Sequence, residues 1–159
     1  MTLAVGDPAP DFALPDAEGN PVKLADLKGQ WVVLYFYPRD NTPGCTKEAC
    51  GFRDAYDQYQ SADVVVLGVS ADDAKAHTKF IAKHQLPFPL LIDEGGQVAA
   101  RYGSYGLKKF MGKEFMGVFR HSFIIGPDGT LQKIYRKVKP EPHAAEVLAD
   151  LATLKAGNA

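Results

Sequence analysis

Two uninterrupted apolar segments constrain the fold of this chain more than any other feature. Residues 31–37 (WVVLYFY) and 64–69 (VVVLGV) contain no charged side chain, and Pro38 ends the first of them. Such runs are typical of strands that are buried on both faces of a parallel or mixed sheet. Both are far shorter than the roughly 20 residues that cross a bilayer. They therefore predict central strands of a globular domain and not membrane segments.

The segments around these two runs predict helices and further strands. From Cys45, apolar residues recur at steps of four and three, which predicts a helix that ends near Gln60. The later patterns predict a helix over 71–84, a strand over 88–92, a short helix over 96–102, strands over 120–125 and 130–137 around a turn at 126–129, and a last helix after residue 142. Alternating strands and helices call for a parallel sheet, to which the late hairpin adds antiparallel strands. The order predicts a three-layer α/β domain with a mixed central sheet and helices on both faces.

The N-terminal part precedes the first buried strand. Residues 8–24 alternate loosely around the turn-forming residues 16–20, which predicts a short hairpin that covers an edge of the sheet. At 159 residues the chain has the length of about one domain, so we expect a single domain over residues 1–159. The covered edge favours a monomer.

Charge and composition exclude several classes of function. Eighteen Lys and Arg against nineteen Asp and Glu leave a formal net charge of −1, which provides no electrostatic footprint for nucleic acid or an anionic membrane. The first 16 residues contain three prolines, three aspartates and no basic residue, unlike a secretory signal. We therefore expect a cytoplasmic protein that binds neither nucleic acid nor membranes.

The segment from Pro38 to Cys45 follows the first core strand, where α/β sheets commonly bind ligands. Cys45 lies in the first turn of the predicted helix, where unpaired N–H groups and the helix dipole favour negative charge. The thiolate, which is the nucleophilic form of cysteine, is such a charge. The alternative is an inert buried cysteine, because free cysteines are among the most buried residues. The Thr-Pro-Gly-Cys helix start favours the reactive thiol.

The second cysteine, Cys50, lies five residues after Cys45. In an ideal helix the two Cα atoms would be roughly 8.7 Å apart, and disulfides rarely span more than about 7 Å. A disulfide between them therefore requires the start of the helix to unwind, which costs least next to Pro43 and Gly44. The spacing predicts a conformational redox switch.

The residues around Cys45 resemble the active-site signature of the peroxiredoxins, which are thiol peroxidases of the thioredoxin-like fold. The signature is Pro38-x-x-x-Thr42-x-x-Cys45, and residues 36–50 (FYPRDNTPGCTKEAC) are similar to the bacterioferritin-comigratory protein, or Q-type, subfamily. Three further segments agree, namely 8–14 (PAPDFAL), 108–112 (KKFMG) and 120–123 (RHSF). The resemblance covers residues 6–137 and implies a thioredoxin-like fold. Arg39 stands where lysine is common, which keeps the charge.

The resemblance implies roles for both cysteines. Cys45 is the peroxidatic cysteine, which reduces hydrogen peroxide or an organic hydroperoxide and becomes a sulfenic acid. Cys50 is the resolving cysteine, which condenses with that acid to an intramolecular disulfide that thioredoxin or a similar dithiol protein reduces. This subfamily resembles monomers more than ring-forming members, and the chemistry requires no cofactor and no metal.

Four more residues match the subfamily, and each also has a structural interpretation. Thr42 would orient the peroxide, although a threonine there can also form a turn or cap the helix. Arg120 would stabilise the thiolate and the departing oxygen, or could be a surface arginine. Glu48 would position Arg120, or only interact with the helix dipole. Pro38 would shield the thiolate from water.

Two other functions are alternatives to the peroxidase. A thiol–disulfide oxidoreductase of the thioredoxin type uses Cys-x-x-Cys, whereas four residues separate the cysteines here. The other candidate is a redox-sensing or zinc-binding interaction module, in which a zinc site would combine Cys45 and Cys50 with His77 and His84, which lie in a different predicted helix. The spacing disfavours both, and stoichiometric metal in the purified protein would favour the second.

Two remaining features are expected to be structural. Lys108, Lys109 and Lys113 form a small basic patch, which we expect to be a solvated loop. His121 follows Arg120 in a predicted strand and therefore points to the opposite face, where it would support the structure.

Overall fold

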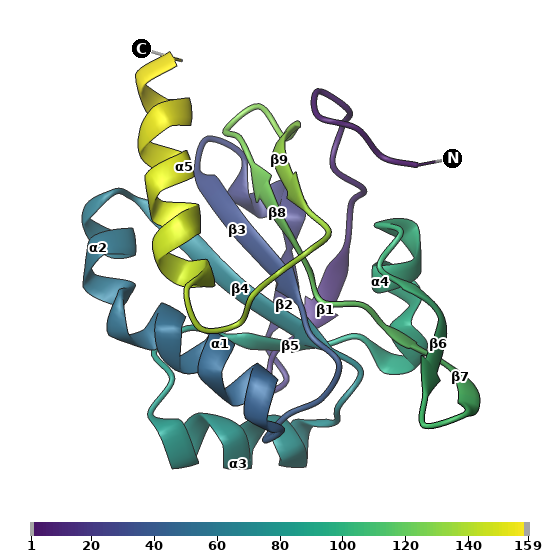
Figure 1. Cartoon of the computed structure of the whole chain (residues 1–159). Helices are drawn as coiled ribbons and strands as arrows, with labels where there is room; N and C mark the ends of the chain where they lie inside the picture. The colour runs from purple at the N-terminus through teal and green to yellow at the C-terminus, as the bar shows by residue number, and fades with distance from the viewer. Residues whose placement is uncertain (1, 158–159) are drawn as a thin grey trace.

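The two apolar runs form adjacent central strands of a five-stranded sheet. The computed structural model describes residues 2–157, and its sheet has the order β5-β4-β3-β8-β9 (Figure 1). Its parallel strands are β3 (Trp31–Phe36), β4 (Val64–Ser70) and β5 (Leu90–Ile92). The antiparallel strands are β8 (His121–Ile125), which pairs with β3, and β9 (Leu131–Tyr135), which pairs with β8. The predicted mixed sheet is confirmed, and every residue of β3 is buried in it.

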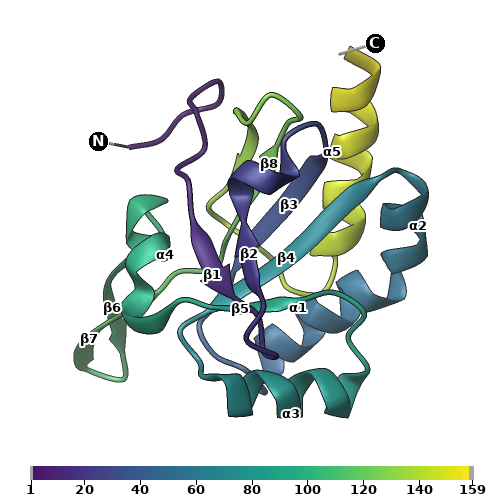
Figure 2. The same cartoon turned by 180° about the vertical axis from the view of Figure 1, so that it is seen from behind.

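Helices cover both faces of this sheet because alternate residues of β3 point to opposite sides. Trp31, Val33 and Tyr35 pack in one core with residues of four helices, α1 (Pro43–Asp54), α2 (Tyr56–Ser61), α3 (Ala74–His84) and α5 (His143–Gly157). Val32 and Leu34 pack in the other core, with the short 3₁₀ helix η1 (Leu24–Leu27) and with α4 (Gln97–Arg101), which Figure 2 shows from behind. None of the helices within residues 2–157 has the length and apolarity that a membrane crossing requires.

The predicted N-terminal hairpin is present, and together with the segment before it the N-terminal part reaches both edges of the sheet. It consists of β1 (Ala13–Pro15) and β2 (Pro21–Lys23). Asp16, directly after β1, bridges Leu91 of the edge strand β5, and Pro8 bridges Thr130 next to the other edge strand, β9. These bridges occupy backbone groups that an open sheet edge would expose.

The boundaries of three helices differ from the predictions. The helix expected over 45–60 is two helices, separated at Ala55. The first of them begins at Pro43, because proline at a first helical position loses no hydrogen bond. The helix expected from residue 71 begins at Ala74, because the Asp73 carboxylate accepts from the Ala76 N–H and caps it. The third, α4, covers only 97–101 and follows the 3₁₀ turn η2 (Glu94–Gly96).

One hairpin was missed. The lysines expected in a solvated loop lie on β6 (Tyr105–Phe110) and β7 (Lys113–Val118), which pair with each other outside the main sheet (Figure 1). Met111 and Gly112 form its two-residue turn with φ of 52° and 78°, the backbone that tight hairpins prefer. Most side chains of the hairpin are exposed, including Phe110 and Met111, so no buried–exposed alternation marks it as a pair of strands.

Candidate active site

Cys45 lies in the first turn of α1, after the loop that leaves the carboxyl end of β3. Pro43 is at the start of this helix, and Thr42 precedes it as the N-cap residue with an extended backbone (φ −93°, ψ 156°). Cys45 is a free thiol and only 1% exposed. The predicted placement of a cysteine at a helix N-terminus is thus present, in the turn whose N–H groups have no partner within the helix.

Arg120 reaches this sulfur from a distant part of the sequence. It directly precedes β8, whose first residue, His121, pairs with Phe36 at the end of β3. Its Nη2 donates to Cys45 Sγ at 3.4 Å. A Cβ atom on Gly44 would lie only 2.9 Å from Nη2, so a side chain at this position would displace the guanidinium. The antiparallel pairing of β3 and β8 therefore brings a cation to the thiol.

Glu48 lies one turn after Cys45 and holds the other side of the guanidinium. Its Oε1 accepts from Arg120 Nη1 at 2.8 Å, and the residue is fully buried. Within residues 2–157 its Oε2 has no hydrogen-bond partner. Burial raises the pKa of Glu48 to about 7, although Arg120 acts in the opposite direction. This contact is what the expected positioning role of Glu48 requires.

The charge of Arg120 is balanced by these two neighbours. Burial alone would lower the pKa of Arg120, but the neighbouring Cys45 and Glu48 raise it above its usual value. Its side chain is 20% exposed, so the ion pair with Glu48 is largely shielded from water. The interpretation of Arg120 as a surface arginine is therefore wrong.

The remaining loop residues surround the entrance to α1. The hydroxyl of Thr42 donates to the backbone carbonyl of Arg39 at 2.9 Å and, within the described chain, makes no capping bond. Thr42 is therefore at the N-cap position without a capping side chain, and its hydroxyl oxygen keeps both lone pairs as acceptors. Pro38 is half-buried at the end of β3, and Arg39 is exposed.

Cys50 is half-buried in the same helix and is also a free thiol. Because α1 is continuous from Pro43 to Asp54, the two cysteines keep helical spacing, at which a disulfide does not form. Ala49 and Phe52, on either side of Cys50, pack in the core with α5. Unwinding of the segment from Cys45 to Cys50 would therefore expose Cys45 and Ala49, which are buried in the closed form.

Sequence reasoning missed one residue beneath the site. Tyr35 of β3 stacks on Phe52 of α1, with ring centroids 4.8 Å apart, and its buried hydroxyl has no partner within residues 2–157. Burial, followed by the nearby Glu48 and Cys45, raises the pKa of Tyr35. An apolar strand pattern gives no sign of such a hydroxyl, because tyrosine counts there only as a packing residue.

Other residues singled out from the sequence lie elsewhere. His77 of α3 contacts Asp40 and the carbonyl of Leu91, not the cysteines. Nδ1 of His121 lies 2.9 Å from the hydroxyl of Ser104, in line with the structural role expected of it.

The basic patch is only partly solvated. Lys108 is half-buried and donates to the Val118 carbonyl at 3.0 Å. Burial lowers its pKa, and the charge of Arg120 lowers it further. The expected solvated loop is therefore wrong for this residue, which lies near enough to the site to sense its charges.

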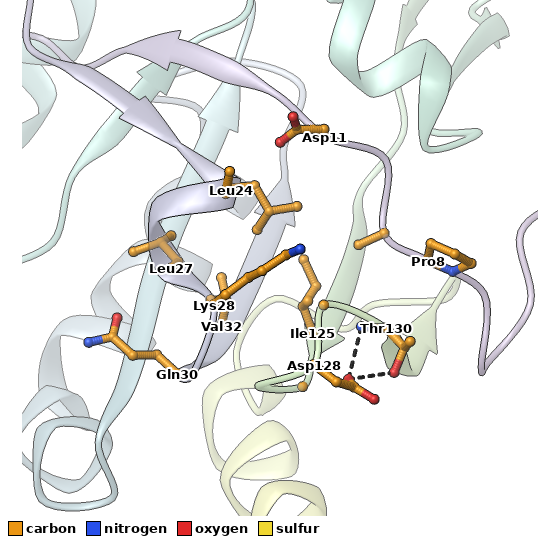
Figure 3. Close-up of a pocket in the computed structure, with 14 residues that line it drawn as sticks. Pro8, Asp11, Leu24, Leu27, Lys28, Gln30, Val32, Ile125, Asp128 and Thr130 are labelled. Carbon is orange, nitrogen blue, oxygen red and sulfur yellow. Dashed lines mark hydrogen bonds between the residues drawn. The ribbon is translucent and has the colours of Figure 1, made fainter.

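A cavity of about 320 Å³ lies away from Cys45. The N-terminal segment, η1 and the turn between β8 and β9 line it, as Figure 3 shows with Leu24, Lys28, Ile125 and Thr130 among the labelled residues. It shares no lining residue with the Cys45 site, and Asp128 at its rim bonds Thr130.

The fold and the site together define a class of protein. The central strand of this thioredoxin-like sheet leads into a helix with a buried cysteine in its first turn, and an arginine that directly precedes the neighbouring antiparallel strand contacts that cysteine, as the resemblance to the peroxiredoxins implies. Residues 5–134 match the AhpC/TSA family. The chain belongs to this family and, within it, to the Bcp or PrxQ type of peroxiredoxin.

Individual relatives agree with this assignment. Peroxiredoxin Bcp of Bacillus subtilis is 48% identical over 151 residues, which cover 95% of this chain and 96% of the relative. The solved structure of the bacterioferritin comigratory protein of Xanthomonas campestris, studied for alkyl peroxide reduction, has a TM-score of 0.89 at 35% identity and covers 96% of this chain and 98% of its own. A cysteine variant of PrxQ from Xylella fastidiosa has a TM-score of 0.90 at 33% identity, with coverages of 96% and 98%. The thioredoxin-like fold that the resemblance implies is therefore confirmed.

Proposed function

We propose that this protein is a thiol peroxidase that reduces hydrogen peroxide and organic hydroperoxides with Cys45 as the attacking residue. The observation that carries the proposal is the hydrogen bond of 3.4 Å from Arg120 Nη2 to the buried Cys45 Sγ at a helix N-terminus. Cationic donors and helix N-termini interact favourably with negative charge, and the thiolate is the form of cysteine that attacks peroxides. The alkyl peroxide reduction of the Xanthomonas campestris relative supports organic hydroperoxides as substrates.

In the first step the thiolate attacks one peroxide oxygen. An S–O bond forms while the O–O bond breaks, so the sulfur is oxidised to a sulfenic acid and the peroxide is reduced. The departing oxygen takes up a proton and leaves as water or as an alcohol. Arg120 stabilises the charge that develops on this oxygen, since its guanidinium already lies beside the sulfur.

Thr42 and Pro38 support this step from the loop. Because the Thr42 hydroxyl proton is used on the Arg39 carbonyl, its oxygen is available to accept from the O–H of a hydroperoxide. Such an acceptor orients the peroxide for in-line attack, which contributes several kcal/mol as proximity. The half-buried Pro38 ring keeps water from the thiolate.

In the second step Cys50 resolves the sulfenic acid. The start of α1 unwinds and the Cys50 sulfur attacks the Cys45 sulfur. An S–S bond forms while the S–O bond breaks, and the hydroxide that leaves takes the Cys50 thiol proton and departs as water. The Pro43-Gly44 start of α1, where glycine weakens the first turn, and the half-buried position of Cys50 support this opening. Thioredoxin, or a similar dithiol protein, then reduces the disulfide by thiol–disulfide exchange.

Mass spectrometry of the protein after one equivalent of hydrogen peroxide tests this assignment. We expect the loss of two hydrogens, with Cys45 and Cys50 in one linked peptide. The Cys45→Ser variant is the control and should neither consume peroxide nor lose mass. Peroxide turnover by that variant would contradict the role of Cys45.

A further inference from the structure

A buried hydrogen-bond network anchors the loop that leads into α1. Asp40, which is 8% exposed, accepts from the Tyr37 hydroxyl on Oδ1 at 2.5 Å. Its Oδ2 lies 2.5 Å from Nδ1 of His77, on α3. Its backbone N–H donates to Asp72 Oδ2 at 2.8 Å. The loop is therefore held at a point two residues before Thr42.

The ring of His77 faces an acceptor at each nitrogen. Nδ1 meets the Asp40 carboxylate, and Nε2 lies 2.9 Å from the backbone carbonyl of Leu91. A neutral imidazole has only one N–H, whereas these contacts require a donor on each side unless Asp40 itself carries the proton. The contacts therefore require one more proton on the pair of His77 and Asp40 than a neutral histidine and an ionised aspartate carry together.

We propose that His77 is a positioning residue for the peroxidase cycle, because the proton that it shares with Asp40 pins the loop before Cys45 in its closed form. Loss of this proton leaves two acceptors opposed inside the protein, and the loop then opens more readily. The opened form is the one in which Cys45 and Cys50 pair, so this inference rests on the proposed function.

The direction of the pH dependence follows from the environment of His77. Burial, the largest effect, lowers its pKa, but the hydrogen bond and charge of Asp40 and the Leu91 carbonyl together outweigh it, so the pKa is raised above 6.5. The closed site therefore holds the proton more tightly than the open one. The proton on His77 stabilises the closed loop fully below about pH 6.5, and this stabilisation is lost as the pH rises through the raised pKa of His77. Because one proton is involved, the equilibrium constant between the closed and the open form of the loop changes by at most about tenfold per pH unit.

The charged and titratable groups that face His77 come from two segments. Asp40 and Tyr37 follow β3, the Tyr37 hydroxyl acting through Asp40, and Asp72 follows β4. Asp72 also accepts from the Ser70 hydroxyl, at 2.6 Å. The ligand atoms of Asp40, Asp72 and His77 lie within 4.8 Å of one another, but both ring nitrogens already have partners, so the ring offers no lone pair to a cation.

Two variants separate the proton from the contact. In Asp40→Asn the amide can donate to Nδ1 of a neutral His77 while its oxygen still accepts from Tyr37, so the loop stays anchored without the shared proton. His77→Gln removes the anchor itself. Lys83→Gln is the matched control, because Lys83 of the same helix donates to the neighbouring loop residue, Asn41, at 3.1 Å but is exposed.

The first experiment measures two quantities in the reduced protein without peroxide. The NMR chemical shifts of the imidazole ring carbons of His77, followed as the pH changes, should give a pKa above 6.5 in the wild type and below 6.5 in Asp40→Asn. Amide exchange over residues 40–50, corrected for intrinsic rates, should lose up to about tenfold of protection per pH unit above pH 6.5 in the wild type and in Lys83→Gln. Asp40→Asn should show a flat profile, and His77→Gln should be less protected at every pH.

The results distinguish a pH-dependent positioning role of His77 from a purely structural one. A wild-type His77 that titrates at or below pH 6.5, or equal pH profiles for the wild type and Asp40→Asn, would overturn the proposal. If His77→Gln does not fold, the comparison of the wild type with Asp40→Asn remains decisive. Because no peroxide is used, a failure of the proposed peroxidase function would leave these results unchanged and would be detected separately in peroxide turnover.

Discussion

Arg120 Nη2 lies 3.4 Å from Cys45 Sγ, although 74 residues separate the two along the chain. The same guanidinium holds Glu48 Oε1 at 2.8 Å through its other terminal nitrogen. A planar fork with two donors in fixed geometry can hold both partners at once, whereas a lysine ammonium is a single point charge. The relation between the thiol and its cation therefore depends on the carboxylate one helical turn further on.

Arg120→Ala should slow the reaction of Cys45 with hydrogen peroxide by about 10²- to 10³-fold, the usual cost of losing one donor to a developing oxyanion. Arg120→Lys should fall between this variant and the wild type, because it keeps the charge but loses the fork. Stopped-flow measurement of the second-order rate constant checks both. Arg39→Ala, with an exposed side chain in the same loop, is the control. An unchanged rate in Arg120→Ala would remove this residue from the site.

Cys50→Ser should still react with one equivalent of peroxide but stop at the sulfenic acid, because the attacking thiol for resolution is missing. A reagent that traps sulfenic acids should label Cys45 in this variant. With thioredoxin as the electron donor, steady-state turnover should be lost after the first equivalent. Full turnover would contradict the resolving role of Cys50.

Glu48→Gln should change how stability depends on pH. Because burial raises the pKa of Glu48 from 4.5 to about 7, its protonated form stabilises the fold fully below about pH 4.5, and this contribution is lost as the pH rises through 7. The free energy of unfolding of Glu48→Gln, relative to the wild type, should therefore increase between pH 5 and pH 8, by at most about 3 kcal/mol. Urea unfolding of both proteins at the two pH values measures this difference. A constant difference would mean that Glu48 titrates in its ordinary range.

Gly44→Ala should displace the guanidinium of Arg120, because the added Cβ would lie 2.9 Å from Nη2. We expect the peroxide rate constant to fall by about tenfold to a hundredfold, as small displacements of catalytic groups do. Gly51→Ala in the same helix is the control, since its Cβ would meet its nearest neighbours at 3.6 Å, an ordinary contact. Equal peroxide rate constants for Gly44→Ala and the wild type would contradict a displacement of the Arg120 guanidinium by the added methyl group.

Local sequence patterns predicted most of the elements. Residues 31–37 and 64–69 are the central strands, because apolar runs of this length bury both faces in a sheet. The hairpin of β6 and β7 escaped prediction, because its strands lie outside the core and show no alternation. The break at Ala55 also escaped, because the apolar spacing continues across it.

The candidate site likewise has features that local sequence predicts and features that depend on the tertiary structure. The sequence alone determined that Cys45 lies in the first turn of a helix after a buried strand, because proline, glycine and apolar periodicity act over a few residues. The contact of Arg120 with Cys45 was expected only through the resemblance, and the tertiary structure decided its geometry, the burial of Glu48 with a pKa of about 7, and the contact of His77 with Asp40. These contacts depend on strand register and on burial, which arise between segments that are distant in the chain and leave no local pattern in it.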